Sequence, residues 1–317
     1  MRRFCVRLIT VSALLYAVAA HAAPAPTAEA VTIWSDGTRL AGDLWKPAGL
    51  GPDERVPAIL LVHGWGGVKS HLNQAYAPVF AGEGMIVLTF DYRGWGESDG
   101  KLMRLGEKPE TDAADMTLEV REVREIVDPI DQLADIRNAL AYLSGEAQVD
   151  VGRLAIWGSS LGGGLALQIA GEYPHIKVLI SQIGAVNSLA NFESGDGAFA
   201  RQAWQRQIRR ARGDAPAFPT GAQPGLRGAP DYFAMSRFDP IAWADDVAAA
   251  TLIIDARDEE LFDIARNGAE LHRRLAGRVP VRYETLPGQH YDIYRDDGYR
   301  QAVALQLEWL RQHLLGD

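Results

Sequence analysis

The sequence feature that most constrains the fold is a serine set between glycines, where an apolar strand pattern gives way to a helical one. Residues 153–164 read RLAIWGSSLGGG, and a helical pattern follows over 165–172. Gly158, Ser160 and Gly162 fit the G-x-S-x-G pattern, in which the glycines permit a tight, strained turn. We therefore predict that Ser160 is a nucleophile at the tip of this turn. The backbone N–H of Leu161 is expected beneath it, at the positive end of the next helix.

The alternative is an ordinary strand-to-helix loop, because a chain with 32 glycines often produces this pattern by chance. The pattern indicates a nucleophile only where it lies between a strand and a helix. The apolar residues at 154–157 and the helical pattern at 165–170 supply both elements, so the sequence favours the nucleophile.

The composition is that of a globular chain with room for one large core. Of its 317 residues, 47% are hydrophobic and 23% are charged, which excludes disordered and collagen-like classes. The net charge of -9 argues against a nucleic-acid partner, since phosphate binding requires a basic surface.

Residues 1–22 follow the plan of a secretory signal peptide. Arg2, Arg3 and Arg7 precede an apolar run at 8–20, and an A-x-A cleavage pattern ends at Ala22. The run is short for a bilayer-spanning helix, so we expect cleavage after Ala22 and a periplasmic or secreted protein without stable membrane insertion. The only cysteine, Cys5, would leave with this segment. The mature chain is therefore predicted to have no disulfide, thiol nucleophile or cysteine-bound metal.

Apolar runs and helical patterns alternate along most of the remaining chain, 23–317. Six short segments, most of them apolar runs, are predicted strands. They lie at 58–62, 85–90, 154–157, 176–180, 251–255 and 281–285. This alternation favours right-handed crossovers and a mostly parallel sheet with helices on both faces. An Asp-Gly turn at 36–37, between two short alternating runs, predicts an antiparallel hairpin before the first of these strands.

Two segments interrupt the alternation. Residues 100–127 form an acidic, weakly periodic insert that we interpret as solvated surface. Residues from about 188 to 240 are too many for one crossover and are predicted to form a small helical lid at the active-site edge of the sheet. Its helix is expected at 199–212, with Phe199 and Ala203 on the stripe that covers the site. The arginines on its other faces are interpreted as solvated charge, with contact to an anionic substrate or lipid headgroup as the alternative.

Four motifs taken together make the chain similar to the α/β-hydrolase family. They are His63-Gly64 after a strand, the DYRGWGES stretch at 91–98, the turn at Ser160, and an acid followed by a histidine late in the chain. The family's order of serine, acid and histidine is kept. The segments 258–262 and 288–294 are most similar to the dienelactone-hydrolase-like and exported esterase branch. The resemblance covers nearly all of 23–317 and implies a single α/β-hydrolase domain.

The resemblance implies a base and an acid for Ser160. A serine hydroxyl needs a base within hydrogen-bond reach, and His290, after the last predicted strand, matches the family's base position. Asp258 best matches the acid that holds this histidine in the useful tautomer, and Glu259 is the main rival. By similarity, the second oxyanion donor is the backbone N–H of Trp65. No metal or cofactor is implied, because these groups already supply nucleophile, base and oxyanion donors.

These residues predict a serine hydrolase that cleaves the carboxylic ester of a small molecule through an acyl-enzyme intermediate. Amide or peptide hydrolysis, as in X-Pro peptidases, is the enzyme alternative, because the same triad serves both bonds. A non-catalytic binding protein on this fold is the alternative from another class. The sequence identifies neither the residues that bind the substrate nor the oligomeric state.

Overall fold

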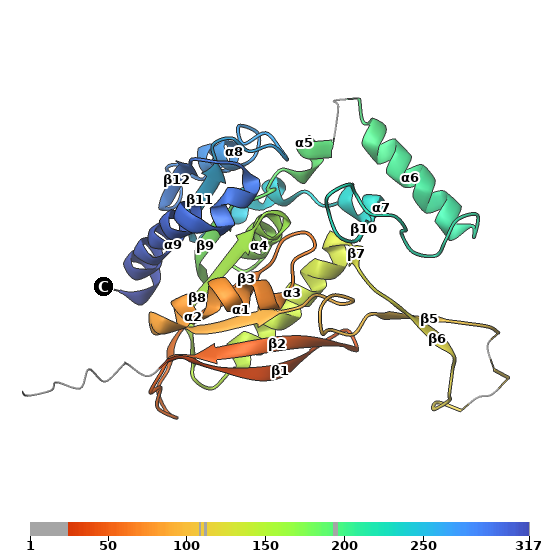
Figure 1. Cartoon of the computed structure of the whole chain (residues 1–317), viewed down its shortest axis with the longest axis horizontal. Helices are drawn as coiled ribbons and strands as arrows, with labels where there is room; N and C mark the ends of the chain where they lie inside the picture. Colours follow the sequence, from red (N-terminus) through yellow and green to blue (C-terminus); the bar gives the residue numbers. More distant parts are fainter. Residues whose placement is uncertain (1–24, 108, 111–112, 193–195, 317) are drawn as a thin grey trace, which may run out of the picture.

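The computed structural model describes residues 25–107, 109–110, 113–192 and 196–316, so the predicted signal peptide at 1–22 lies outside the described residues. Its centre is an eight-stranded sheet in the order β1-β2-β4-β3-β8-β9-β11-β12 (Figure 1). The strands are β1 (Thr27–Ser35), β2 (Thr38–Lys46), β3 (Val56–Val62), β4 (Ile86–Phe90), β8 (Val149–Ser159), β9 (Ile176–Gln182), β11 (Ala250–Ala256) and β12 (Val281–Leu286).

The sheet is mostly parallel, as the alternation of strands and helices predicts. The pairs from β4 through β3, β8, β9 and β11 to β12 all run parallel. Only the hairpin of β1 and β2 is antiparallel, within itself and where β2 joins β4. The predicted hairpin therefore forms one edge of the sheet, and the serine turn lies at the end of a central strand.

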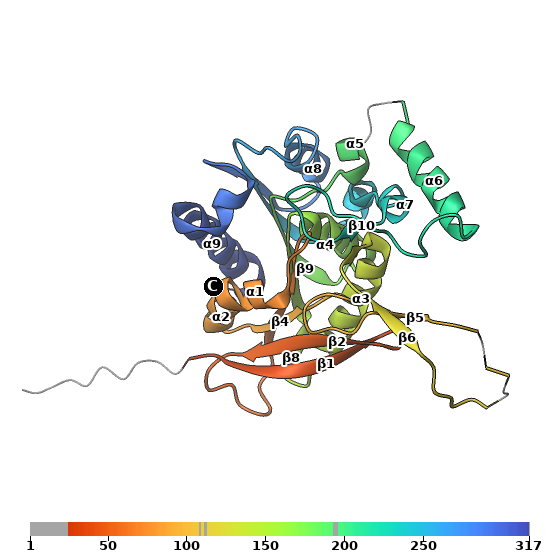
Figure 2. The same cartoon turned by 45° about the vertical axis from the view of Figure 1, so that its right-hand side comes forward.

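Helices cover both faces of this sheet (Figure 2). One face packs on α3, α4 and α8, and the other packs on α1, α2 and α9. The helices are α1 (Lys69–Ala75), α2 (Ala77–Gly82), α3 (Pro129–Gly145), α4 (Leu161–Glu172), α8 (Gly268–Leu275) and α9 (Asp296–Leu310), which continues into the π-helical turn η3 (Arg311–Leu315).

The inner strands read as apolar runs because their successive side chains enter opposite cores. In β3, Leu60 packs with the core under α3 and α4, whereas its neighbour Leu61 packs with the core under α1 and α9. In β8, Ile156 packs with the core under α3 and α4, and its neighbour Trp157 packs with the core under α1 and α9. A strand buried on both faces has no solvent side and therefore shows no polar alternation.

The acidic insert is more regular than the sequence analysis expects. It forms an antiparallel pair, β5 (Lys101–Arg104) and β6 (Val120–Val123), that projects away from the domain in both views (Figures 1 and 2). The pair has few neighbours to bury its side chains, and Leu102 is 66% exposed. Most of the insert lies on the surface, as predicted, although Val127 at its end is buried in the core. Its strand structure is not revealed by its weak periodicity.

Beyond β9, the insertion contributes three helices, a connecting loop and a short strand at the rim of the domain. They are α5 (Ser188–Phe192), α6 (Ala198–Ala211), β10 (Ala229–Pro230) and α7 (Tyr232–Met235), and β10 pairs with β7 (Ile126–Val127). The 3-10 helix η1 (Pro240–Asp246) then leads back to β11. Within the described ranges, no helix has an apolar stretch long enough to cross a bilayer.

Helix α6 occupies the predicted helical segment of the insertion. Its inner side is anchored by Phe199, which stacks on Phe192 with ring centroids 4.8 Å apart, and by the ion pair of Arg210 with Asp231 at 2.8 Å. Beside this stripe, Trp204 packs on Phe233 of α7 with ring centroids 5.4 Å apart, yet it remains 54% exposed. The helix therefore packs on its own insertion through the stripe that begins at Phe199.

Candidate active site

Ser160 lies at the junction of β8 and α4 in a strained backbone conformation. Its φ is 56° and its ψ is -125°, a region that residues with a side chain rarely occupy. The flanking glycines are required by close contacts: a Cβ at Gly158 would lie 2.1 Å from the carbonyl oxygen of Gly162. A Cβ at Gly162 would lie 2.4 Å from the carbonyl oxygen of Val62. The turn therefore has the tight geometry that the G-x-S-x-G pattern predicts.

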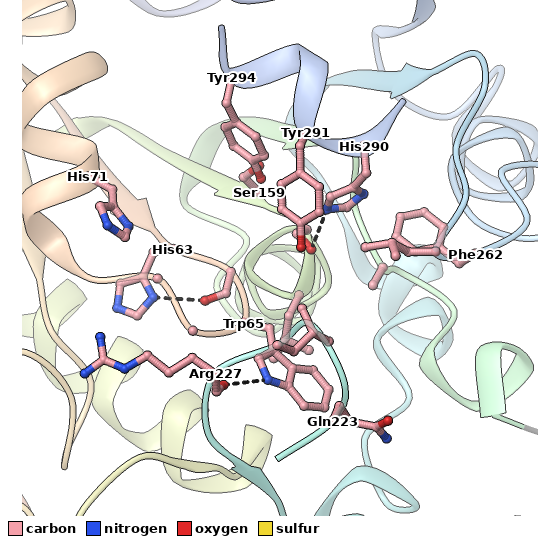
Figure 3. Close-up of a pocket in the computed structure, with 18 of the residues that line it drawn as sticks. His63, Trp65, His71, Ser159, Gln223, Arg227, Phe262, His290, Tyr291 and Tyr294 are labelled. Atoms are coloured by element: carbon pink, nitrogen blue, oxygen red, sulfur yellow. Dashed lines mark hydrogen bonds between the residues drawn. The ribbon is translucent and has the colours of Figure 1, made fainter. Parts of the chain in front are cut away.

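The ring of His290, which Figure 3 shows at the cavity, lies between Ser160 and the carboxylate of Glu259. His290 follows β12 as the first residue of η2 (His290–Tyr294), and it is 1% exposed. Its Nε2 lies 3.1 Å from Ser160 Oγ. Its Nδ1 lies 2.9 and 2.8 Å from the two carboxylate oxygens of Glu259. This arrangement requires Nδ1 to carry the proton, so that neutral His290 presents Nε2 to the serine hydroxyl as an acceptor.

The carboxylate that contacts His290 belongs to Glu259 and not to Asp258, the predicted acid. The turn after β11 is pinned by two backbone bonds, from Arg257 N–H to the Leu286 carbonyl at 2.7 Å and from Asp258 N–H to the Gly288 carbonyl at 3.0 Å. Held in this way, Asp258 is exposed, whereas the side chain of Glu259 turns inward and is 1% exposed. Position along the chain alone does not tell which of two adjacent acids in a turn faces the histidine.

Glu260 is a further acid that the sequence analysis does not assign. Its carboxylate accepts a hydrogen bond from the backbone N–H of His290 at 2.9 Å. The two glutamates therefore hold the histidine at two points, Glu259 through the ring and Glu260 through the main chain. The crowding of acids at 258–263 is the signal that points to this loop.

A second set of hydrogen bonds joins the histidine-bearing segment to the serine turn, and the sequence analysis misses it. Tyr294, also in η2, has its hydroxyl 2.7 Å from the Oγ of Ser159 (Figure 3). Gln182 donates from Nε2 to the same Oγ at 3.2 Å, and Gln306 donates to the side-chain carbonyl of Gln182 at 2.7 Å. Burial raises the pKa of Tyr294, so its hydroxyl stays protonated and available for this bond.

The two predicted oxyanion donors lie on segments that meet at Ser160. Leu161 is the first residue of α4, and N–H groups in a first helical turn have no acceptor within the helix. The loop before Trp65 packs closely on this point, since a Cβ at Gly64 would lie 2.9 Å from the Cβ of Ser160 and 3.6 Å from the backbone nitrogen of Leu161. The structure therefore brings Trp65, Ser160 and Leu161 together as the resemblance implies.

A cavity of about 800 Å³ opens onto Ser160 and His290. Its wall is mostly apolar and aromatic, and the charged or imidazole-bearing residues on it are His63, His71, Arg227 and His290. The apolar and aromatic part of the wall includes Trp65, Leu72, Tyr76, Trp157, Leu161, Phe192, Leu226, Met235, Phe238, Leu261, Phe262, Tyr291 and Tyr294. This volume accommodates a small organic molecule with its carbonyl at the serine.

The insertion reaches this cavity through residues other than those of the predicted helix. None of the described residues of α6 lines the cavity, so the prediction that this helix covers the site directly is wrong. Phe192 of α5 and the loop 223–227 line it instead. The helix packs one layer behind, against Phe192, and its apolar stripe serves that contact.

The ring of His63 contacts its own loop, whereas the ring of His290 contacts Ser160. Burial lowers the pKa of His63 to about 4, and its Nδ1 lies 3.1 Å from the Gly64 carbonyl, a contact that requires the proton on Nδ1. Its role in the structure is to pack against Tyr92, with ring centroids 4.3 Å apart. In the described part of the chain, no group of three or more histidine, cysteine, aspartate or glutamate side chains has an arrangement suited to a metal ion.

Comparisons with known proteins place the chain among hydrolases. The family model of X-Pro dipeptidyl-peptidases (S15 family) matches residues 36–211, more than half of the 317 residues. A relative from Escherichia coli, an uncharacterised 31.7 kDa protein in the traX-finO intergenic region, is 24% identical over 284 residues. That match covers 81% of this chain and 91% of the relative.

Solved structures agree with the architecture. The α/β hydrolase GrgF from Penicillium sp. sh18 has a TM-score of 0.68 at 16% identity, covering 92% of this chain and 99% of that one. The Pyrococcus furiosus esterase PF2001 has a TM-score of 0.59 at 15% identity, covering 91% of this chain and 92% of that one. At these identities the likeness shows the fold, and the predicted α/β-hydrolase fold is confirmed.

Proposed function

The chain belongs to the X-Pro dipeptidyl-peptidase (S15) family and is a hydrolase of the α/β-hydrolase type, and from this premise we propose that it hydrolyses carboxylic esters with Ser160 as nucleophile. One observation carries the proposal: the continuous hydrogen-bond path from Ser160 Oγ through both ring nitrogens of His290 to the buried carboxylate of Glu259. A serine hydroxyl with such a base and orienting acid can attack a carbonyl at neutral pH.

The proposed reaction proceeds in two halves. Ser160 Oγ attacks the ester carbonyl carbon while its proton passes to His290 Nε2, and Glu259 stabilises the imidazolium that forms. The backbone N–H groups of Leu161 and Trp65 bind the oxyanion of the tetrahedral intermediate. As the intermediate collapses, His290 returns the proton to the departing alkoxide and an acyl-enzyme remains. Water, deprotonated by the same histidine, then releases the carboxylic acid and regenerates the serine.

The cavity wall favours an ester over an X-Pro peptide, the main alternative. A dipeptidyl peptidase substrate brings its N-terminal ammonium close to the cleaved bond, and a buried ammonium is costly without an anionic partner. The ionisable residues on the described wall, tyrosines aside, are His63, His71, Arg227 and His290. An uncharged acyl group meets no such cost there, and the aromatic side chains offer it apolar contact.

The test compares the two bond types on the purified mature chain. We expect turnover of p-nitrophenyl esters, labelling of Ser160 by a fluorophosphonate probe, and little release of p-nitroaniline from X-Pro anilides. Ser160→Ala should abolish both turnover and labelling, with an unchanged circular dichroism spectrum as the folding control. Faster cleavage of the X-Pro anilide would favour the peptidase, and absent labelling of a folded protein would favour a binding protein.

We also propose that the protein is exported, on the basis of residues 1–22 alone. Expression of the full chain in a bacterial host, followed by N-terminal sequencing of the periplasmic and medium fractions, should give a mature protein that begins at Ala23. Recovery of the full-length chain in the cytoplasm would contradict export.

A further inference from the structure

The loop at residues 223–228, here called the strap, forms part of the cavity wall. Gln223, Leu226 and Arg227 line the cavity, and the strap passes beside Trp65 (Figure 3). The contact is close, because a Cβ at Gly66 would lie 3.3 Å from the Cβ of Arg227. The strap therefore adjoins the loop that carries one of the proposed oxyanion donors.

The strap is held on one side by the segment that follows β6. The Arg227 guanidinium pairs with Glu125 and lies over the ring of Trp95, 5.8 Å from its centroid. The backbone N–H of Ala229 donates to the Glu125 carbonyl at 2.8 Å. Gly228 is pressed against Trp95, since a Cβ there would lie 2.5 Å from the indole. This side of the strap is therefore anchored by side-chain and main-chain contacts alike.

On its other side, the strap accepts a hydrogen bond from the oxyanion loop. The indole Nε1–H of Trp65 donates to the main-chain carbonyl of Arg227 at 3.0 Å. Trp65 follows Gly64 and precedes Gly66 and Gly67, so the loop has little side-chain bulk of its own to hold its main chain. The same residue thus has its backbone N–H at the proposed oxyanion site and its side chain tied to the strap.

We propose that the Trp65 indole is a positioning residue that couples the strap to the oxyanion site, so that strap placement sets both turnover and the acyl size accepted. The inference rests on the proposed ester hydrolysis at Ser160. The backbone N–H of Trp65 stabilises the oxyanion only when its main chain is held in place, and the indole bond supplies that restraint. Release of the bond lets the strap move outward, which lowers turnover and enlarges the space for long acyl chains.

The experiment removes the indole N–H with as little change in the ring as possible. Benzothienylalanine incorporated at position 65 replaces N–H by sulfur and keeps the two-ring shape, and Trp65→Phe is the simpler companion. Trp309→Phe is the matched control, because Trp309 Nε1 also donates to a main-chain carbonyl, that of Ala250 at 3.3 Å. This bond lies on the sheet face that packs on α9, away from the cavity wall. Values of kcat and KM are measured across p-nitrophenyl esters from acetate to decanoate, with the unfolding temperature of each variant.

We expect kcat for the acetate to fall about fivefold in the position-65 variants, the effect of one lost hydrogen bond, with KM nearly unchanged. The ratio of decanoate to acetate turnover should rise. Trp309→Phe should lower only the unfolding temperature. Equal kcat in wild type and the benzothienylalanine variant, or an equal loss in Trp309→Phe, would overturn the coupling.

A second variant keeps the proposal testable if changes at Trp65 prevent folding. Arg227→Ala retains the carbonyl acceptor but removes the exposed ion pair with Glu125, so it loosens the strap from its other side. It should shift the same acyl ratio upward and lower kcat, and an unchanged profile would refute strap control. If the wild type neither turns over esters nor labels at Ser160, the proposed ester hydrolysis is wrong. If the wild type is active but the variants behave like it, only the coupling of the strap to the oxyanion site is wrong.

Discussion

The assignment of Glu259 as the acid, in place of its neighbour Asp258, leads to a sharp prediction. Glu259→Gln keeps the size of the side chain but replaces one carboxylate oxygen by an NH₂ group. That donor faces His290 Nδ1, now 2.8 to 2.9 Å from the carboxylate. The ring would then favour the tautomer with its proton on Nε2, which cannot accept the proton of Ser160.

The expected cost follows from the geometry. Both carboxylate oxygens contact the ring and the side chain is 1% exposed, so no solvent can substitute for the lost charge. A wrong tautomer and an unstabilised imidazolium together lower kcat by about 10³- to 10⁴-fold, equivalent to about 4 to 5.5 kcal/mol of transition-state stabilisation. Asp258→Asn, one residue earlier and exposed, should change kcat by less than about twofold.

The assay is hydrolysis of p-nitrophenyl acetate by wild type, Glu259→Gln and Asp258→Asn, with thermal unfolding to confirm that each variant is folded. Glu259→Asp provides a graded control, since its carboxylate is retained but its side chain is one methylene shorter. It should retain more activity than Glu259→Gln. The reasoning is refuted if Asp258→Asn loses more activity than Glu259→Gln, or if Glu259→Gln keeps a tenth of wild-type kcat.

Three other predictions test neighbouring features. Tyr294→Phe removes the hydroxyl 2.7 Å from Ser159 Oγ and should lower kcat several-fold at constant KM; a change in KM alone would contradict a role in holding η2 on the serine turn. Burial raises the pKa of Asp255 to about 7, so its protonated form stabilises the fold fully below about pH 4 and this stabilisation is lost as the pH rises to about 7. The unfolding temperature of Asp255→Asn relative to wild type should therefore increase between pH 5 and pH 8, and a constant difference would contradict it. Phe192→Ala, on the cavity wall, should change the acyl-chain preference, whereas Trp204→Ala, on α6 and away from the cavity wall, should not, as kcat/KM across the ester series would reveal.

The sequence alone was sufficient for the sheet and for the serine. Inner strands such as β3 and β4 are buried on both faces and read as apolar runs, and each predicted strand is present within a few residues. The turn at Ser160 is local, because close main-chain contacts dictate the glycines around it. Both features depend on residues that are neighbours along the chain, so they can be recognised without the tertiary structure.

The choice between Asp258 and Glu259, the Tyr294 bond to Ser159 and the contact of Trp65 with the strap were decided only by the tertiary structure. The acid and the Tyr294 partner depend on how the loops after β11 and β12 close over the end of β8, elements separated by about a hundred residues or more. The strap meets Trp65 across 162 residues. The type of a residue limits which bonds it can make, but the packing of distant segments decides its partner. The exposure and direction of a loop side chain depend on the backbone hydrogen bonds that hold the loop in place.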